Sequence, residues 1–579
     1  MDNIIQKVKD DIKNILIKAI EKAKADGILP ISEVPKIELE EPKEKQHGDI
    51  AANTAMVMAK SAKMPPRRIA EIILNNINIT DEILSKADDI LSNLDLSKTF
   101  IRKIEIAGPG FINFYLKDDY LQEALKLIYK KGKEYGRVNI GNNRKVQVEF
   151  VSANPTGPMH MGNARGGALG DALASVLDYA GYDVTREFYI NDAGNQIEKF
   201  GYSLEARYLQ LLGINAEVPE GGYQGDDIVE RAKEFLDIYG DKYKDTPSEI
   251  RRKALINYGL EKNLEKIKED LQLYGIHYDV WFSEQSLYDS KEVYKVIEEL
   301  KQKGYTYEKD GALWFKMTQF GAEKDDVLVR ANGFPTYLAS DIAYHKNKFI
   351  TRGFDWVINV WGADHHGHVA PMKGAMGALG INPDRLDVVL MQLVKLIEGG
   401  EIVRMSKRTG KMVTLRDLID EVGKDAARFF FNMRSADSPV EFDLDLAKEQ
   451  SNDNPVFYVQ YAHARICSII RQLEEEGVKI EDIEKVDLSL LKEEVEKDLI
   501  KKLAYFPEEI TIAANTMAPH RITRYILEVA SNFHSFYNSC RVKGVDDNLM
   551  KARLVLIIAV RTVIKNVLDM MNITAPEKM

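Results

Sequence analysis

The stretch that decides the fold is VQVEFVSANPTGPMHMGNARGGALGDALASVLDYAGYDVTREFYI, residues 146–190. Its first six residues alternate apolar and polar side chains, which predicts a β-strand over residues 146–151 with Glu149 on the polar face. A turn-rich SANPTGP follows, and apolar residues then recur at helical spacing up to Gly181, a typical position for a C-terminal cap. A second strand, DVTREFYI, begins two residues later. Strand, loop, helix and strand in this order predict a right-handed parallel crossover and a Rossmann-type α/β fold.

The second half of this fold is expected much later in the chain. Strand-like runs resume with WVINVW at 356–361 and DVVLMQLV at 387–394, and glycine-containing loops follow both. Between the two halves, residues from about 198 to 325 are charge-rich and helical with few motifs, which is typical of an insertion. The sequence therefore predicts an α/β domain whose two halves are separated by an inserted segment.

Smaller domains are expected on either side of the α/β core. Up to about residue 120, helical stretches accompany the glycine-punctuated strand signal IEIAGPGFINFYL, which predicts a small α+β domain. Beyond about residue 445, glycine becomes scarce and helical periodicity takes over. We therefore expect an N-terminal α+β domain over residues 1–120, a parallel-sheet domain over 121–445 and an all-helical domain over 446–579.

Composition excludes several classes of protein. A chain of 579 residues with 45% hydrophobic and 29% charged residues is too long for one small module and can build ordinary packed cores. Its net charge of −11 argues against coating nucleic acid through bulk positive charge, although it does not exclude local basic grooves. Two cysteines without a CxxC pair cannot form a disulfide framework or a structural zinc site. Because the N-terminus is charged and the apolar run Leu554–Val560 is short, we expect a cytoplasmic protein without a membrane segment.

The loop NPTGPMHMGN, Asn154–Asn163, joins the first strand to the helix. At that point the free backbone N–H groups of the helix N-terminus favour a bound phosphate. His160 can add a donor, and Gly162 lets the backbone approach a nucleotide closely. An isolated HxGN sequence is more often an incidental helix start, so this loop alone does not identify a nucleotide site.

A second candidate is the basic loop EIVRMSKRTGK at residues 401–411. Its clustered cations suit a polyphosphate, although a solvated basic turn is the simpler explanation of this loop alone. The two loops together favour a nucleotide site over the simpler explanations, because His160 lies in one predicted α/β half and Lys407 in the other. The cations of this loop are Arg404, Lys407, Arg408 and Lys411.

This arrangement resembles the HIGH and KMSK signatures of class I aminoacyl-tRNA synthetases, and the opening stretch closely resembles bacterial arginyl-tRNA synthetases. YVQYAHARICSIIR (458–471), APHRITRYILEVASNFHSFYNSCRV (518–542) and the terminal ITAPEKM resemble the helical anticodon-binding domain of that family. HGDIAANTAM (47–56) and GPGFINFYL resemble its N-terminal domain. Asn163 replaces the last histidine of HIGH and Arg404 the first lysine of KMSK, and each keeps a hydrogen-bonding or cationic group.

The resemblance implies which residues handle ATP. His160 and Lys407 are expected to neutralise charge on the transferring phosphate, with Arg404 and Arg408 assisting. The segment WGADHHGH (361–368) holds three histidines that also suggest a metal site. We expect substrate contact there and no bound metal, because the segment has no cysteine partner, follows a predicted strand and resembles the GADHHG stretch at the ATP and amino-acid site of the family. The expected ATP ligands are Pro158, His160, Gly162, Asn163, Asp364, His365, Met405, Ser406 and Lys407.

Arginine needs carboxylate acceptors for its planar guanidinium group. Glu149 precedes the phosphate loop, and Asp341 follows Tyr337 by four residues, so a helical turn would present both side chains together. The simpler explanations are an exposed strand residue and an ordinary surface pair. The resemblance implies instead that all three contact the guanidinium group. It also implies further arginine ligands, namely Asn113, Asn154 and His366.

Bases of tRNA are expected to contact the helical domain, because unstacked RNA bases are recognised by stacking and hydrogen bonding. Guided by the resemblance, we predict such contacts for Tyr458, Gln460 and Tyr461. Histidines of this domain are expected to be structural, and its arginines could bind phosphate or only solvate helices.

The resemblance implies an arginine–tRNA ligase. The arginine carboxylate would attack the α-phosphate of ATP bound to Mg²⁺, which gives arginyl-adenylate and pyrophosphate. The terminal ribose of an arginine-specific tRNA would then attack the acyl carbon and release AMP. No tightly bound cofactor is expected, and the family is mostly monomeric. One alternative is a class I synthetase for another amino acid, with a neutral or thiol-selective pocket in place of Glu149 and Asp341. The other is a non-catalytic tRNA-binding paralogue, which would have lost His160 or Lys407.

Overall fold

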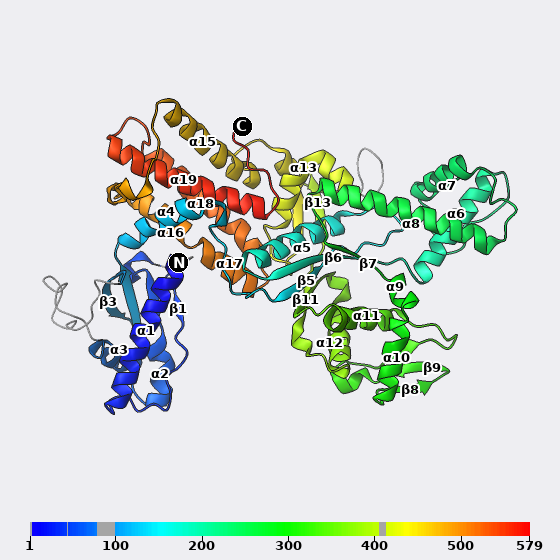
Figure 1. Ribbon diagram of the computed structural model, residues 1–579, viewed down its shortest axis with the longest axis horizontal. Helices are drawn as coiled ribbons and strands as arrows, with labels where there is room; N and C mark the ends of the chain where they lie inside the picture. Colours follow the sequence, from blue (N-terminus) through cyan, green and yellow to red (C-terminus); the bar gives the residue numbers. More distant parts are fainter. Residues whose placement is uncertain (1–2, 43, 78–98, 404–412) are drawn as a thin grey trace.

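At the centre of the molecule lies a five-stranded parallel sheet with the strand order β12-β11-β5-β6-β7. The structure is a computed structural model that describes residues 3–42, 44–77, 99–403 and 413–579 (Figure 1). Each strand is parallel to its neighbours, as the predicted crossover requires. In sheet order the strands span Leu386–Met391, Trp356–Gly362, Lys145–Glu149, Asp183–Ile190 and Val280–Ser283.

Strand β5 is buried on both faces. Val146 and Val148 are fully buried as expected, but Gln147 is also 0% exposed and Glu149 only 7%. The simpler explanation of Glu149 as an exposed strand residue is therefore excluded, because helices cover both faces of a parallel sheet. This burial makes Glu149 a carboxylate that needs a partner.

Helix α5 (Met161–Tyr179) is the crossover between β5 and β6. Its predicted apolar stripe is at most 2% exposed, and Gly181 follows with a φ of 84°. A Cβ atom at Gly170 would lie 2.3 Å from Cγ of Phe150, so only glycine allows this close approach of helix and chain. The stripe consists of Leu169, Ala172, Leu173, Val176, Leu177 and Ala180.

The segment expected as one insertion, residues 198–325, is divided by a strand of the central sheet. Its first part forms three helices that share an apolar core and project from the sheet (Figure 1). Strand β7 then returns to pair with β6. Four residues are too few for an alternation to reveal this strand, so the sequence alone does not predict the division. The three helices are α6 (Asn195–Leu211), α7 (Asp226–Tyr239) and α8 (Ser248–Leu273).

A second subdomain follows β7 and has its own core, which includes Tyr189 of β6 and Val357 of β11. Helix α11 (Tyr337–Lys346) belongs to it and continues into a π-helical turn, Asn347–Thr351. Three antiparallel strands with the order β10-β9-β8 form its outer part. The other elements are α9 (Gln285–Asp289), α10 (Glu292–Gln302), β8 (Thr306–Lys309), β9 (Ala312–Phe315), β10 (Asp326–Val329) and α12 (Val369–Ala378).

The run predicted as one strand at 387–394 contributes to two strands. β12 ends at Met391, and β13 begins a second sheet in which β14 is antiparallel and β15 parallel to it. The apolar run continues across this break, so its periodicity cannot locate it; the backbone N–H of Gln392 instead donates to Ala436 O at 2.9 Å. The elements are β13 (Val394–Glu398), β14 (Glu401–Val403), α13 (Leu415–Phe431), β15 (Val440–Asp443) and α14 (Leu444–Lys448).

The N-terminal part is a small α+β domain, as predicted. Its antiparallel sheet has the order β1-β2-β4-β3, and one face of the long helix α1 is buried. Helix α4 follows the sheet and packs on the C-terminal helices α16 and α19. The elements are α1 (Ile4–Ala25), β1 (Leu39–Glu40), β2 (Ile50–Ala52), α2 (Thr54–Ala62), α3 (Pro66–Asn75), β3 (Ile101–Ala107), β4 (Phe111–Leu116) and α4 (Asp119–Lys131).

From residue 455 onward the secondary structure is helical, as predicted. The apolar run Leu554–Val560 lies in the buried part of α19. The side chain of Glu508 on α17 binds Asn3 and Lys9, which joins this domain to the N-terminal one. Among the described residues, no helix is both long and apolar enough to cross a membrane. The helices are α15 (Pro455–Glu475), α16 (Glu494–Ala504), α17 (Phe506–Asn515), α18 (His520–Ser539) and α19 (Asp547–Met570).

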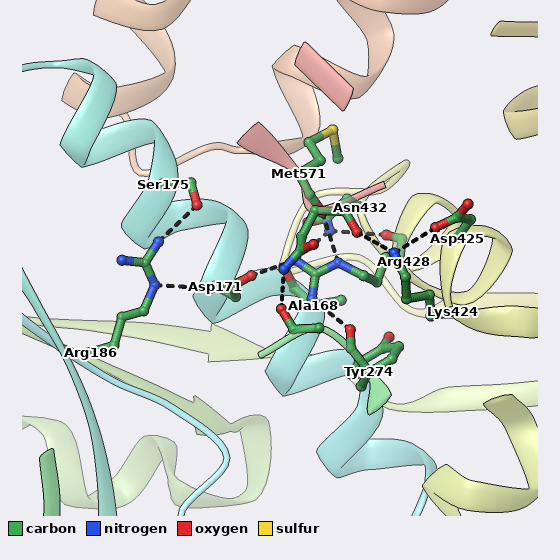
Figure 2. A network of polar contacts seen from close by, with 12 residues as sticks. Ala168, Asp171, Ser175, Arg186, Tyr274, Lys424, Asp425, Arg428, Asn432 and Met571 are labelled. Atoms are coloured by element: carbon green, nitrogen blue, oxygen red, sulfur yellow. Dashed lines mark hydrogen bonds and ion pairs between the residues drawn. The ribbon is translucent and has the colours of Figure 1, made fainter. Parts of the chain in front are cut away.

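The helical domain is fastened to the α/β core through Arg428, which is 0% exposed (Figure 2). Its guanidinium donates to Met571 O at 2.7 Å, to Tyr274 O at 3.2 Å and to the carboxylate of Asp171 on α5. Asp171 also accepts from Arg186 at 2.9 Å. One side chain of α13 thus joins the segment after α19 to the helix that follows the phosphate loop.

Candidate active site

His160 is the N-cap residue of α5. Its Nδ1 accepts the backbone N–H of Gly162 at 3.0 Å, and its own backbone N–H donates to Oδ1 of Asn163 at 3.0 Å. Because Nδ1 is an acceptor, the ring hydrogen is on Nε2, which can donate to a ligand. Partial burial lowers the pKa of His160, so the ring is a neutral donor at pH 7. Asn163, which departs from the family signature, completes the cap by binding back.

A cleft of about 1240 Å³ lies against this helix end. Asn154 and the tip of the loop form one wall, and the ends of β11, β12 and β13 form another. Of the predicted ligands of ATP and arginine, the cleft brings together Asn154, Pro158, His160, Gly162, Asn163, Asp364 and His365. Residues that the sequence did not indicate also line it, among them Tyr223, Asp227, Gln392 and Lys395. Tyr223 lies in the loop before α7 and Asp227 in α7 itself, both within the inserted segment, where no motif pointed to them.

The predicted ligands of the basic loop lie outside the described residues; these are Arg404, Met405, Ser406, Lys407 and Arg408. The residues on either side of residues 404–412, Val403 and Val413, line the cleft. Thr414 forms an isolated antiparallel bridge with His160, and Leu415 N donates to Met159 O at 2.9 Å. The chain that follows residues 404–412 is therefore joined by backbone contacts to the residues at the start of α5.

The predicted arginine ligand Glu149 has partners on both oxygens. Ser152 Oγ donates to Oε1 at 3.0 Å, and Lys348 Nζ donates to Oε2 at 2.6 Å. Since Ser152 also lines the cleft, Glu149 lies directly behind the phosphate loop. Its pairing with a lysine means that one oxygen is already neutralised before a substrate binds.

Asp341 lies on α11, one turn after Tyr337, as the spacing predicts. Burial, and then repulsion by Glu284 and Glu149, raise the pKa of Asp341 to about 8, against the opposing effect of Lys348. Glu284 is 3% exposed, and burial raises its pKa to about 7, with a contribution from Asp192. No ion pair among the described residues includes either carboxylate. We call Glu149, Glu284 and Asp341 the acidic pocket.

Sequence reasoning missed Glu284 of the acidic pocket and several residues around the pocket. Glu284 follows the short strand β7 and carries no local signal. The hydroxyl of Tyr189 is buried without a partner, and burial together with Glu284 and Asp341 raises its pKa. His345 and Lys348, in contrast, continue the helical spacing of Tyr337 and Asp341, so this spacing could have indicated them.

Three predicted arginine ligands are placed differently from Asp341. Tyr337 is 48% exposed and packs against Gly194, where an added Cβ would lie 3.5 Å from its ring. His366 is exposed on the turn Ala363–His368 and does not line the cleft. Asn113 is 3% exposed on β4, in the N-terminal sheet, and the structure does not bring it to the cleft. Among the described residues there is no group of three side chains placed to bind a metal ion.

The predicted tRNA contacts all lie on α15. The ring of Tyr458 is 4.7 Å from that of His534, and Arg465 lies between Tyr461 and Tyr537 at 4.6 and 4.7 Å. Gln460 instead donates to Asp425 at 3.1 Å and to Thr574 O at 2.9 Å. The two tyrosines are therefore part of a partly exposed aromatic surface, whereas the amide of Gln460 is engaged within the protein.

Three family models match the chain one after another. Arginyl tRNA synthetase N terminal domain matches residues 6–87 and 84–116, and tRNA synthetases class I (R), catalytic domain matches residues 124–441. DALR anticodon binding domain matches residues 459–579. The parallel sheet, the capped phosphate loop and these matches define a class I aminoacyl-tRNA synthetase.

Similarity over the whole chain identifies the family within this class. The chain is 76% identical over 579 residues to the arginine–tRNA ligase of Caldanaerobacter subterraneus subsp. tengcongensis and 58% identical over 581 to that of Ruminiclostridium cellulolyticum; both alignments cover all of each chain. The Thermus thermophilus arginyl-tRNA synthetase has the same fold, with a TM-score of 0.74 at 21% identity, over 98% of this chain and 100% of that one. The chain belongs to the arginine–tRNA ligase family and attaches arginine to tRNA with the use of ATP. Both alternatives considered from the sequence are thereby excluded.

Proposed function

We propose that ATP binds in the cleft against the N-terminus of α5 and that arginine binds behind it, in the acidic pocket. The observation that carries this proposal is the pair of carboxylates Glu284 and Asp341, which have no cation partner among the described residues. A guanidinium group supplies the missing charge and up to five donors in one plane. The unpartnered hydroxyl of Tyr189 offers a further acceptor.

Glu149 has a different role in this proposal from the one that the sequence suggested. Lys348 donates to one oxygen of Glu149, so Glu149 is less able than Glu284 or Asp341 to form a bidentate hydrogen-bonded pair with a guanidinium group. We assign the guanidinium group to Glu284 and Asp341, with Tyr337 at the edge of the pocket, and a single-oxygen contact to Glu149. Asn154 would bind the part of arginine nearest ATP, while Asn113 and His366 stay predictions without a supporting contact.

The reaction follows from this placement. An oxygen of the arginine carboxylate attacks the α-phosphorus of ATP, the bond to the bridging oxygen of the β-phosphate breaks, and pyrophosphate leaves with both electrons. His160 donates from Nε2 to the phosphate, and the first N–H groups of α5 stabilise its charge. Pro158, Gly162, Asn163, Asp364 and His365 shape the ATP site, and Mg²⁺ enters as part of the substrate on its phosphates.

The second step transfers the arginyl group to tRNA. A hydroxyl of the terminal ribose attacks the acyl carbon of the adenylate, its proton is lost to solvent or AMP, and AMP leaves. Lys407, assisted by Arg404 and Arg408 and with Met405 and Ser406 beside them, is assigned to phosphate binding from the resemblance alone. Tyr458 and Tyr461 are assigned to stacking on tRNA bases, supported by the aromatic surface that they share with His534.

The overall organisation is proposed on the same basis. Residues 1–120, 121–445 and 446–579 would form the N-terminal, catalytic and anticodon-binding domains. We propose, from the family resemblance alone, that the enzyme acts as a monomer in the cytoplasm.

The test is arginine-dependent exchange of pyrophosphate into ATP, measured with tRNA present. Glu284→Gln and Asp341→Asn should each raise the KM for arginine by about a hundredfold, because each removes a charged acceptor for a buried cation. The KM for ATP should stay within about threefold in both variants, since the phosphate loop is untouched. Glu299→Gln, on α10 and paired with Lys303 and Lys346, is the control. An unchanged KM for arginine in both pocket variants would overturn the assignment.

A further inference from the structure

Lys348 is a fully buried lysine that the reaction described above does not use. Its side chain is 0% exposed and projects from the π-helical turn after α11. Nζ donates to Glu149 Oε2 at 2.6 Å and to Asn359 Oδ1 at 3.0 Å. Burying two opposite charges costs stability unless their geometry is good, and apolar replacements are often no worse for folding. A single π-helical turn is often found at functional sites, which adds a reason to ask what this lysine does.

Glu149 and Asn359 face Lys348 together because of the sheet register. They are direct partners in the parallel pair β5 and β11, so their side chains lie on the same face. The ammonium group bridges them and directs Glu149 Oε2 toward the sheet neighbour. Among the described residues, Oε1 then accepts only from the neutral hydroxyl of Ser152, a residue that lines the cleft. Lys348 thus decides which oxygen of Glu149 is available.

Hydrogen bonds continue from Asn359 to the backbone of Asp341, the residue that carries a second carboxylate of the pocket. Asn359 Nδ2 lies 2.7 Å from His345 Nε2, and His345 Nδ1 lies 2.8 Å from the backbone oxygen of Asp341. Since Asn359 Oδ1 accepts from Lys348, its amide donates to His345, which in turn donates from Nδ1 to Asp341 O. Burial lowers the pKa of His345 well below its ordinary value, in keeping with this neutral form. In this series of hydrogen bonds, each donor therefore points away from Lys348 and toward Asp341.

The position of Lys348 also affects the net charge of the acidic pocket. Three carboxylates close together in a buried space repel one another, and burial together with this repulsion raises the pKa of Asp341. Once all three are ionised, as binding of a guanidinium group requires, one ammonium group leaves two negative charges in excess. Free arginine presents two positive groups, the guanidinium and the α-ammonium, and its carboxylate is needed at ATP. With Lys348 in place the excess charge of the pocket equals that of the two groups it has to bind.

We infer that Lys348 is a positioning residue for arginine: its ammonium group orients Glu149 toward the substrate and sets the excess charge of the acidic pocket. This inference rests on the proposed function, because it takes Glu149, Glu284 and Asp341 as the arginine site. It concerns recognition of the amino acid and leaves ATP binding to the phosphate loop. A lysine needed only for folding would affect both substrates alike or neither.

The experiment compares two substitutions of Lys348 with one of its neighbour. Lys348→Gln keeps a donor for Glu149 and Asn359 but removes the charge, and Lys348→Met removes both. Lys346→Gln is the matched control, because Lys346 is in the same helix end and pairs with Glu299 at 2.5 Å, away from the pocket. The KM values for arginine and ATP are measured by pyrophosphate exchange with tRNA present, over a range of pH, and folding is followed by thermal unfolding.

Lys348→Gln should raise the KM for arginine by about tenfold or more and leave the KM for ATP within about threefold. Its best use of arginine should move to higher pH, because Lys348 counteracts the rise that burial causes in the pKa of Asp341, and without Lys348 that carboxyl group ionises at a higher pH. Lys348→Met should show the larger effect, and if it does not fold, the glutamine variant carries the test. A folded Lys348→Gln with the arginine KM and pH profile of the unchanged enzyme would overturn the inference. Failure of the proposed function is distinguishable, since it would appear as unchanged arginine KM in Glu284→Gln and Asp341→Asn.

Discussion

The phosphate loop and the acidic pocket adjoin each other, yet different interactions hold their side chains in place. In the loop, hydrogen bonds join residues two or three positions apart, use neutral groups and border an open cleft. In the pocket, the contact between Glu149 and Lys348 joins residues 199 positions apart and involves buried charges. ATP binding therefore depends on the local geometry of one helix end, whereas arginine binding depends on the assembly of several elements and on protonation.

The largest effect on activity is expected when the phosphate loop loses the ring N–H donor of His160. His160→Ala should lower kcat of arginine activation by about 10² to 10³, the usual cost of losing a donor to a developing charge. The KM for arginine should change little, because the pocket keeps all its charges. Single-turnover formation of the adenylate measures the step directly, with the exposed His277→Ala as the control. An equal loss in arginine affinity would mean that the two sites are not separate.

Changes of pH should separate the two regions next. In the empty pocket the pKa values of Asp341 and Glu284 are raised to about 8 and about 7, so these groups hold protons that a bound guanidinium must displace. Arginine affinity should therefore be lost as pH falls through this range and gained as pH rises. Between pH 6.5 and 8.5 the KM for arginine should fall by about tenfold or more.

The KM for ATP supplies the internal control for this pH series. The pKa of His160 is lowered, so its ring stays neutral across the same range and the loop should bind ATP almost equally well. Calorimetry in buffers of different ionisation enthalpy should also detect protons released when arginine binds. Binding without proton release at pH 7 would contradict the charge state assigned to the pocket.

The smallest effect on activity is expected from a substitution of Asn163, which caps the helix within the phosphate loop. Asn163→Ala removes the acceptor for the His160 N–H and leaves the ring donor in place, so it separates capping from catalysis. It should cost about 1 kcal/mol of stability, as for other N-terminal caps, and reduce kcat far less than His160→Ala. Denaturant unfolding together with the exchange assay measures both. If the two variants lose the same activity, the role of His160 is structural.

The local contacts of the loop explain how much the sequence could predict. The strand, the loop and α5 were predicted because their signals lie within 45 consecutive residues, 146–190. The cap at His160 needs only its neighbours, and the pair Tyr337 and Asp341 needs only one helical turn. For the same reason the helical C-terminal domain and the small N-terminal sheet were predicted correctly.

Contacts between distant segments explain what could not be predicted. Glu284 becomes an arginine ligand candidate only because β7, four residues long, joins the sheet beside β6. The lysine partner of Glu149 and the wall contributed by Tyr223 likewise depend on tertiary packing. Asn113 was assigned to the site by a family motif and stays a prediction; it is buried on β4 in the N-terminal sheet and does not line the cleft.

The junction at Arg428 bears on how the chain is completed during translation. Residues 171 and 428 leave the ribosome before residue 571, whose carbonyl accepts from Arg428 across 143 positions of the sequence. Until that carbonyl arrives, the buried guanidinium group of Arg428 lacks one of its acceptors, which disfavours the packed form. The nascent catalytic core therefore stays less stable than the finished one until the chain beyond α19 has been made. Assembly of the ATP site is in this way coupled to completion of the domain assigned to tRNA.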